Sequence, residues 1–268
     1  MERVALHSPP RSGSTWLGEI FNSNPAVKYC YQPLFSYSLK SFLDEKCSKS
    51  EIDEFFDRLL ATEDEFILQT QQRRDGLLPA FRKSAPPTHV VYKEVRYHHL
   101  LPRMAEQEPA LRFVLLIRNP LEVMASWISA PKEFKPEWSV DGELLKAELK
   151  NGGRPEEFYG LLKWIEATNL FLRLAQDYRD RVLIVEYREL EQRPVQTVEQ
   201  IFRFCGLDFD AQTAGFLQDS QTKARDDAYS VFRGNRKRDA WKETLSEANI
   251  ALIRRQVSAS GLARFLQP

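Results

Sequence analysis

Residues 3–16 read RVALHSPPRSGSTW: a short apolar run, a polar turn and the start of a helix. The apolar run at 4–6 predicts a buried strand, which ends at prolines 9 and 10 because proline continues neither a sheet ladder nor a helix interior. Residues 12–15 then offer small side chains, hydroxyl groups and approachable N–H groups where a helical spacing begins. A helix N-terminus after a strand predicts an anion-binding loop, and Arg11 adds a planar cation suited to phosphate-like oxygens.

A simpler interpretation of the Ser-Gly-Ser segment at 12–14 is an ordinary helix cap. The strand before the segment and Arg11 beside it favour the anion-binding interpretation. The loop does not have the Walker A pattern, which requires a lysine where Ser14 stands. The sequence therefore argues against a nucleoside triphosphatase.

Composition limits the class of protein. A chain of 268 residues, 43% hydrophobic and 28% charged, is long enough for one large domain. Basic and acidic residues number 38 each, which argues against a general nucleic-acid or membrane-surface binder. The three cysteines form no C-x-x-C pair, and no run approaches the roughly 18 apolar residues of a membrane helix. We expect a cytoplasmic protein with no disulfide framework, no metal and no membrane span; the sequence carries no signal for an oligomeric state.

Predicted strands alternate with predicted helices along the chain. After the first strand, apolar runs predict strands at 27–31, 89–95, 111–117 and 182–187. Helical spacings and their stop signals predict helices at 14–24, 121–127, 158–177, 197–205, 211–217 and after Ser246. This alternation predicts an α/β fold, a P-loop-like parallel sheet flanked by helices, with ligand sites at the carboxyl ends of the strands.

Two segments interrupt the alternation, at 34–88 and 130–156. The first has a helical spacing near 52–60 and is otherwise polar or rich in breakers, which predicts a mobile or substrate-facing excursion. The second has several prolines and glycines around a charged stretch. We therefore expect residues 1–268 to form a single domain with two insertions that face the substrate.

A second candidate anion site follows the predicted strand at 111–117. Arg118 ends this strand, and Ser126 lies eight residues later, about two turns into the helix that begins at Asn119-Pro120. The two side chains converge on one phosphate if that helix folds back beside the sheet. A surface ion pair for Arg118 and an ordinary helical position for Ser126 are the simpler alternative.

A third basic group is RGNRKR at 233–238, with four cations in six residues. Such a run is usually a solvated loop, although Gly234 permits close approach of the backbone to a ligand. Together with the loop and Arg118, it gives three separate cationic positions. Three such positions suit a nucleotide with phosphates at both ends.

Five segments together resemble the sulfotransferase family. PPRSGSTW at 9–16 is similar to its 5'-phosphosulfate loop, and RNPLEVMAS at 118–126 is similar to its 3'-phosphate motif. KEVR at 93–96 and YSVFRGNRKRDAWKETLS at 229–246 resemble the carbohydrate sulfotransferase branch. VEYREL at 185–190 resembles the strand whose tyrosine lies near adenine. The segments keep the family order across most of the chain.

The resemblance implies transfer of a sulfuryl group from 3'-phosphoadenosine 5'-phosphosulfate (PAPS) to a hydroxyl or amine of a small-molecule or carbohydrate-like acceptor. The product nucleotide is adenosine 3',5'-bisphosphate (PAP). The residues implied for the 5'-phosphosulfate are Arg11, Ser12, Gly13, Ser14 and Thr15; those for the 3'-phosphate are Arg118, Ser126 and Arg233, with Gly234 beside them. Trp16 and Tyr187 would border adenine, and each equally suits a core position.

For catalysis, the resemblance implies that Arg11, the loop N–H groups and Lys93 stabilise charge on the leaving oxygen, with no metal. A surface lysine at a strand end is the simpler reading of Lys93. An acceptor alcohol also needs a general base, but the family glutamate aligns with Gln32, whose amide takes no proton. The remaining candidates are Glu94, His98, His99, Glu19 and His7. Adjacency to Lys93 favours Glu94 or His99.

Two other function classes stay open. With Gln32 at the acid position, the chain is alternatively a catalytically silent protein that binds PAPS or PAP. A P-loop kinase is a weaker alternative, because the loop has no lysine. Nucleotide binding without turnover would indicate the first, and phosphate release from ATP the second.

Overall fold

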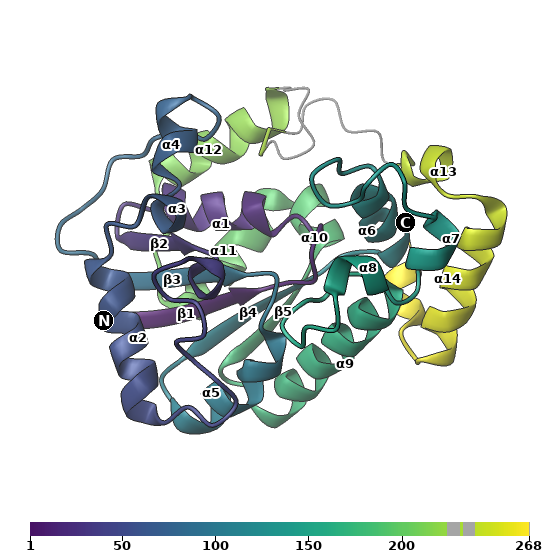
Figure 1. Ribbon diagram of the computed structural model, residues 1–268. Helices are drawn as coiled ribbons and strands as arrows, with labels where there is room; N and C mark the ends of the chain where they lie inside the picture. Colours follow the sequence, from purple (N-terminus) through teal and green to yellow (C-terminus); the bar gives the residue numbers. More distant parts are fainter. Residues whose placement is uncertain (224–230, 233–238, 268) are drawn as a thin grey trace.

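A five-stranded parallel sheet organises the computed structural model, which describes residues 1–223, 231–232 and 239–267 (Figure 1). The strands are β1 (Glu2–His7), β2 (Val27–Tyr31), β3 (His89–Glu94), β4 (Arg112–Ile117) and β5 (Val182–Glu186). Their order in the sheet is β2-β3-β1-β4-β5, and all neighbouring pairs are parallel. The predicted α/β fold is confirmed.

The strands are largely apolar because both faces of the sheet are covered. In β4, Phe113 and Leu115 pack into one hydrophobic core, and Val114 and Leu116 into the other. All four side chains are fully buried. Burying a side chain of this size stabilises the fold by roughly 1.5–3 kcal/mol. This two-sided burial explains why β4 appears in the sequence as a continuous apolar run instead of an alternating one.

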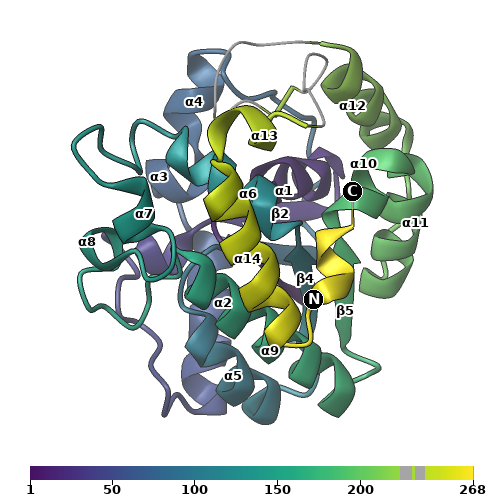
Figure 2. The ribbon, with the colours of Figure 1, turned by 90° about the vertical axis from the view of Figure 1, so that its right-hand side faces the viewer.

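Two helical layers cover the faces, as the two views show (Figures 1 and 2). The helices that contribute to one core are α1 (Ser14–Ser23), α10 (Tyr187–Gln192), α11 (Pro194–Cys205) and α12 (Ala211–Thr222). The main helices that contribute to the other are α2 (Lys49–Ala61), α5 (Leu101–Gln107), α6 (Pro120–Ile128), α9 (Leu161–Asp177) and α14 (Glu247–Ala259). The shorter helices are α3 (Glu65–Leu68), α4 (Thr70–Arg74), α7 (Val140–Glu143), α8 (Glu148–Asn151) and α13 (Trp241–Thr244).

Several predicted boundaries differ from the structure, among them the start of α11, which is Pro194 and not residue 197. Tyr187 is the first residue of α10 and not the last of a strand, because the ladder between β4 and β5 ends at the pair Ile117 and Glu186. The helix predicted from residue 158 begins at Leu161. Its N-cap, Gly160, has a φ of +86°, and a Cβ there would lie 2.9 Å from the Leu145 carbonyl oxygen. The helix predicted at 211–217 continues to Thr222.

The excursion at 34–88 contributes to the core through α2. Ser48 and Glu51 form a capping box that starts this helix. Phe55 and Phe56, both fully buried, then pack against Tyr92 of β3. This part of the segment is therefore core structure and not a mobile excursion.

No helix in the described part of the chain combines the length and apolar character needed to span a bilayer.

Candidate active site

The loop between β1 and α1 is set by two residues in the left-handed region of backbone conformation. Arg11 has a φ of +65° and Gly13 a φ of +90°. The loop is tied down by the Ser8 N–H, which donates to the Glu94 carbonyl oxygen over 3.2 Å, and by the Ser12 N–H, which donates to the Pro9 carbonyl oxygen over 3.3 Å. Gly13 is the N-cap of α1, and no side chain of the described residues caps this end. The predicted open helix N-terminus is therefore present.

Ser12 supplies a polar group that fits an anionic ligand. Its side chain is fully buried, and its Oγ has no hydrogen-bond partner within the described ranges. A buried hydroxyl without a partner carries a desolvation cost, which a bound anion would relieve by accepting its hydrogen bond. Neither Ser12 nor Ser14 is the N-cap of α1, because Gly13 occupies that position. An ordinary serine cap therefore does not explain the Ser-Gly-Ser segment.

The two predicted anion motifs meet at Arg11. Its Nε donates to the Ser126 Oγ over 3.2 Å, and Arg118 Nη1 donates to the Arg11 carbonyl oxygen over 3.3 Å. The helix that carries Ser126, α6, begins at Pro120, where the Asn119 side chain accepts a hydrogen bond from the Leu121 N–H. The structure thus links Arg118 and Ser126 through Arg11, and Arg118 also forms an ion pair with Glu122 over 2.6 Å, as in the simpler alternative. The convergence of Arg118 and Ser126 on one phosphate stays a prediction.

Arg118 also joins this group to the two predicted adenine residues. Its guanidinium lies 4.4 Å from the ring centroid of Tyr187, whose ring makes an edge contact with Trp16 at 6.3 Å. The Trp16 Nε1 donates to the Ser220 Oγ over 3.0 Å, and both rings are buried. Their contact with adenine stays a prediction. Arg233 and Gly234 lie outside the described residues.

Lys93 and Glu94 lie at the end of β3, beside the loop. The Lys93 ammonium is buried, 4.5 Å from the ring centroid of Tyr31, and burial lowers its pKa. The pKa of Glu94 is raised by its burial. Glu94 Oε1 accepts a hydrogen bond from the Leu34 N–H over 2.8 Å. Lys93 is therefore not the surface lysine of the simpler reading.

Gln32 lies beside this pair. Its N–H donates to the Lys93 carbonyl oxygen over 2.8 Å, and its side-chain oxygen accepts from Arg96 Nη1 over 2.9 Å. Arg96 in turn forms an ion pair with Glu157 over 2.9 Å. The neutral amide is thus held in place by an arginine that already has a carboxylate partner.

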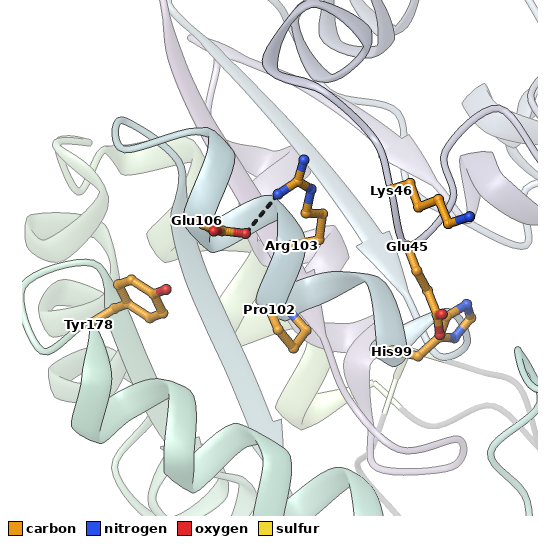
Figure 3. A pocket seen from close by; sticks show the side chains of 7 residues that line it. All are labelled: Glu45, Lys46, His99, Pro102, Arg103, Glu106 and Tyr178. Atoms are coloured by element: carbon orange, nitrogen blue, oxygen red, sulfur yellow. Dashed lines mark hydrogen bonds and ion pairs between the residues drawn. The ribbon is translucent and has the colours of Figure 1, made fainter.

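His99 lies elsewhere. It lines an open pocket of about 650 Å³ whose other residues are Glu45, Lys46, Pro102, Arg103, Glu106 and Tyr178 (Figure 3). None of these seven belongs to the anion loop or to the Arg118 group. Burial lowers the pKa of His99. Its role as a general base stays a prediction, and the structure does not bring it together with Lys93 and Glu94.

Sequence reasoning did not assign a role to two charged residues near the loop. Arg96 falls within the KEVR motif, which was the available signal for it. Glu133 lies in the 130–156 excursion, and its Oε1 is 3.9 Å from Arg11 Nη1. No spacing or motif in the sequence indicates this contact.

Comparison with known proteins identifies the family. A family model described as "Sulfotransferase family" matches residues 4–211. Human carbohydrate sulfotransferase 3 is 29% identical over 145 residues, which cover 52% of this chain and 30% of that protein. The mouse protein of the same name is 28% identical over 152 residues, which cover 53% of this chain and 31% of the mouse protein. The chain thus spans less than a third of the length of the curated relatives it matches.

Solved structures agree on the fold. Mouse sulfotransferase SULT7A1, complexed with PAP, superposes with a TM-score of 0.61 at 15% identity, covering 99% of this chain and 87% of that one. Retinol dehydratase in complex with retinol and PAP superposes with a TM-score of 0.55 at 13% identity, covering 96% of this chain and 80% of that one. The sulfotransferase domain from the curacin biosynthetic pathway superposes with a TM-score of 0.53 at 17% identity, covering 96% of this chain and 97% of that one. Together with the family match over residues 4–211, these findings show that the chain belongs to the sulfotransferase family.

Proposed function

We propose that this chain transfers the sulfuryl group of PAPS to a hydroxyl or amine of a small-molecule or carbohydrate-like acceptor and releases PAP. The observation that carries the proposal is the meeting of Arg11, Arg118 and Ser126 at the carboxyl ends of β1 and β4. Relatives named carbohydrate sulfotransferase support the acceptor class, and neighbours complexed with PAP support the nucleotide.

The loop and the Arg118 group would hold the two ends of the nucleotide. Arg11 and residues 12–15 would bind the 5'-phosphosulfate, and the buried Ser12 hydroxyl fits this role because it lacks a partner within the described residues. Arg118 and Ser126 would bind the 3'-phosphate, together with Arg233 and Gly234. Tyr187 and Trp16 would border adenine, with Arg118 stacked on the Tyr187 ring.

PAPS supplies an activated sulfuryl group attached to a phosphate leaving group. Arg11 and Lys93 would stabilise the negative charge that develops on the leaving oxygen. The buried position of Lys93 favours this role, because an ammonium shielded from water interacts more strongly with an anion than an exposed one. Burial lowers the pKa of Lys93, and a bound anion nearby would raise it again and keep the ammonium charged.

Gln32 favours a second candidate, a protein that binds PAPS or PAP without transferring sulfuryl groups. The side-chain oxygen of Gln32 is occupied by Arg96, and the amide takes no proton. The two candidates share the nucleotide site and differ in turnover.

Calorimetric titration with PAP, with ATP in parallel, tests the nucleotide site. We expect PAP to bind, ATP to bind much more weakly, and Arg118→Ala to weaken PAP binding by at least tenfold, as loss of a charge-assisted hydrogen bond implies. Arg74→Ala is the matched control, because this arginine is exposed and pairs with Glu65 away from the loop. Absence of PAP binding by the wild type would refute both candidates.

Turnover is then measured with PAPS against sugars, phenols, alcohols and amines, with release of PAP into water followed in the same assay. Transfer to an acceptor supports the enzyme. PAP binding without any release of PAP from PAPS supports the silent binding protein.

We also propose a reducing, cytoplasmic location. All three cysteines, Cys30, Cys47 and Cys205, are free and buried. Burial raises the pKa of Cys30 and of Cys205 to about 12, so neither forms a reactive thiolate. Cell fractionation with an antibody tests this, and recovery of the protein from a secretory compartment would contradict it.

A further inference from the structure

Glu133 places a carboxylate beside the arginine of the anion loop. Its Oε1 lies 3.9 Å from Arg11 Nη1. The backbone around it is fixed, because the Glu133 N–H donates to the Ala130 carbonyl oxygen over 2.9 Å and its carbonyl oxygen accepts from the Trp127 Nε1 over 3.3 Å. Trp127 is buried, so the core holds Glu133 in this position.

The Glu133 carboxylate also lies close enough to Lys93 for its negative charge to act on the ammonium. Burial raises the pKa of Tyr31 and of Tyr159, and the charge of Glu133 raises both further. About a fifth of the Glu133 side chain is exposed, at 21%. Its Oε2 is buried and has no hydrogen-bond partner among the described residues. A buried carboxylate oxygen without a partner carries a desolvation cost, which a donor group of a bound ligand would relieve.

The other candidate bases are less suited to accept a proton from such a ligand. Gln32 is a neutral amide whose oxygen is occupied by Arg96. Glu94 is fully buried, and the rise in its pKa favours the protonated acid. His99 lines the pocket of Figure 3, whose residues do not include the loop.

We propose that Glu133 is the general base of the transfer reaction and replaces the carboxylate that is missing at Gln32. This assignment rests on the proposed function. A lone pair of the acceptor oxygen forms the new S–O bond, and the bond between sulfur and the bridging phosphate oxygen breaks. That oxygen leaves on PAP with the electron pair, and the acceptor proton passes to Glu133 Oε2.

The test compares Glu133→Gln with Glu137→Gln, a matched change at an exposed glutamate of the same segment. Rates of PAP release from PAPS are measured with the best acceptor of the wild type, and with water alone. We expect Glu133→Gln to lower kcat by about 10²–10⁴-fold, the usual contribution of a general base. We expect Glu137→Gln to match the wild type.

Two readouts separate a chemical role from a structural one. PAP affinity, measured by calorimetry, should stay within about threefold of the wild type in Glu133→Gln. In Glu133→Ala, added formate should restore part of the turnover, because a small carboxylate can enter the space and take the proton. Thermal unfolding of each variant checks that it folds like the wild type.

The outcomes are distinguishable. A large loss of kcat, with PAP affinity kept and rescue by formate, supports the assignment. If Glu133→Gln keeps more than a third of the wild-type rate, or loses PAP affinity or its fold along with activity, the assignment is overturned and the proposed function stands. If the wild type releases no PAP from PAPS, both fall.

Discussion

Arg11 Nε donates a hydrogen bond to Ser126 Oγ over 3.2 Å, joining the loop after β1 to the helix after β4. The two strands are neighbours in the sheet, so their carboxyl ends lie together although they are far apart in the chain. Arg11 also faces Glu133 and receives at its carbonyl oxygen a hydrogen bond from Arg118. The loop arginine is thus the point at which the three elements of the candidate site meet.

Replacing Arg11 by lysine should weaken binding of PAP at least tenfold. Lysine keeps the positive charge but loses the planar fork, so it cannot bridge Ser126 and a phosphate group at once. A lost charge-assisted hydrogen bond is worth about 1.5–3 kcal/mol, or about 10- to 150-fold in affinity. Calorimetric titration with PAP measures the change. Arg58→Lys, at an exposed position on α2, is the control, and equal affinity of Arg11→Lys and wild type would contradict the role given to Arg11.

Tyr187 should support PAP binding through its ring and not through its hydroxyl. Its ring lies under the Arg118 guanidinium at 4.4 Å, whereas its hydroxyl donates to Glu191 over 3.3 Å. Tyr187→Phe should therefore keep PAP affinity within about twofold. Tyr187→Leu should weaken it by roughly 3- to 30-fold, the worth of a cation–π contact and the orientation it gives Arg118. Equal losses in both variants, measured by calorimetry on folded protein, would contradict this account.

Local patterns were enough to predict the strands and the family motifs. The run at 111–117 has no polar alternation, and that is the pattern of a strand covered on both faces, as β4 is. Arg118 and Ser126 were predicted because their spacing is local to one strand and one helix. The order β2-β3-β1-β4-β5 was not predictable, since it depends on pairing between strands far apart in the chain.

Contacts between segments far apart in the chain also account for the parts of the site that the sequence did not indicate. Glu133 meets Arg11 only because the segment after α6 returns to the loop after β1. Tyr187 was predicted to end a strand, since VLIVEY is apolar except for its glutamate and contains three β-branched residues. Its conformation is helical because the ladder stops one residue earlier, at Glu186. Contacts of this kind are set by tertiary structure, and single-sequence patterns do not carry them.

A buried ion pair fastens the 34–88 excursion to α1. Arg73 of α4 donates to Glu19 Oε1 over 2.7 Å and to its Oε2 over 3.0 Å, and Glu19 is fully buried. Arg73→Met should lower the free energy of unfolding by about 3–5 kcal/mol, because it leaves a buried carboxylate without its charged partner. The double variant Glu19→Gln with Arg73→Met should be less destabilised than Arg73→Met alone. Urea denaturation of the four proteins measures this cycle.

The neighbouring Arg74 provides the control for that cycle. It lies in the same helix and pairs with Glu65, but both side chains are exposed. Arg74→Met should therefore lower the free energy of unfolding by less than about 1 kcal/mol. If Arg73→Met and Arg74→Met cost the same, the pair with Glu19 does not hold the excursion in place.

His7 should make the fold less stable in weak acid. It is fully buried beside His98 and Tyr92, and burial with the nearby charge of Lys93 lowers its pKa to about 3. The unfolded chain binds the proton near pH 6.5, so the stability due to neutral His7 is complete above that pH and is lost as the pH falls toward 3. When the pH falls from 7.5 to 5.5, the free energy of unfolding should therefore decrease by about 1 kcal/mol more in the wild type than in His7→Asn. Urea unfolding of both proteins at the two pH values measures this difference, in which the contributions of Glu94 and of other groups cancel.

His7→Asn is expected to be the less stable protein at pH 7.5, because it loses two buried hydrogen bonds, but the less sensitive one to acid. Identical losses in the two proteins would mean that His7 is already charged in the folded state.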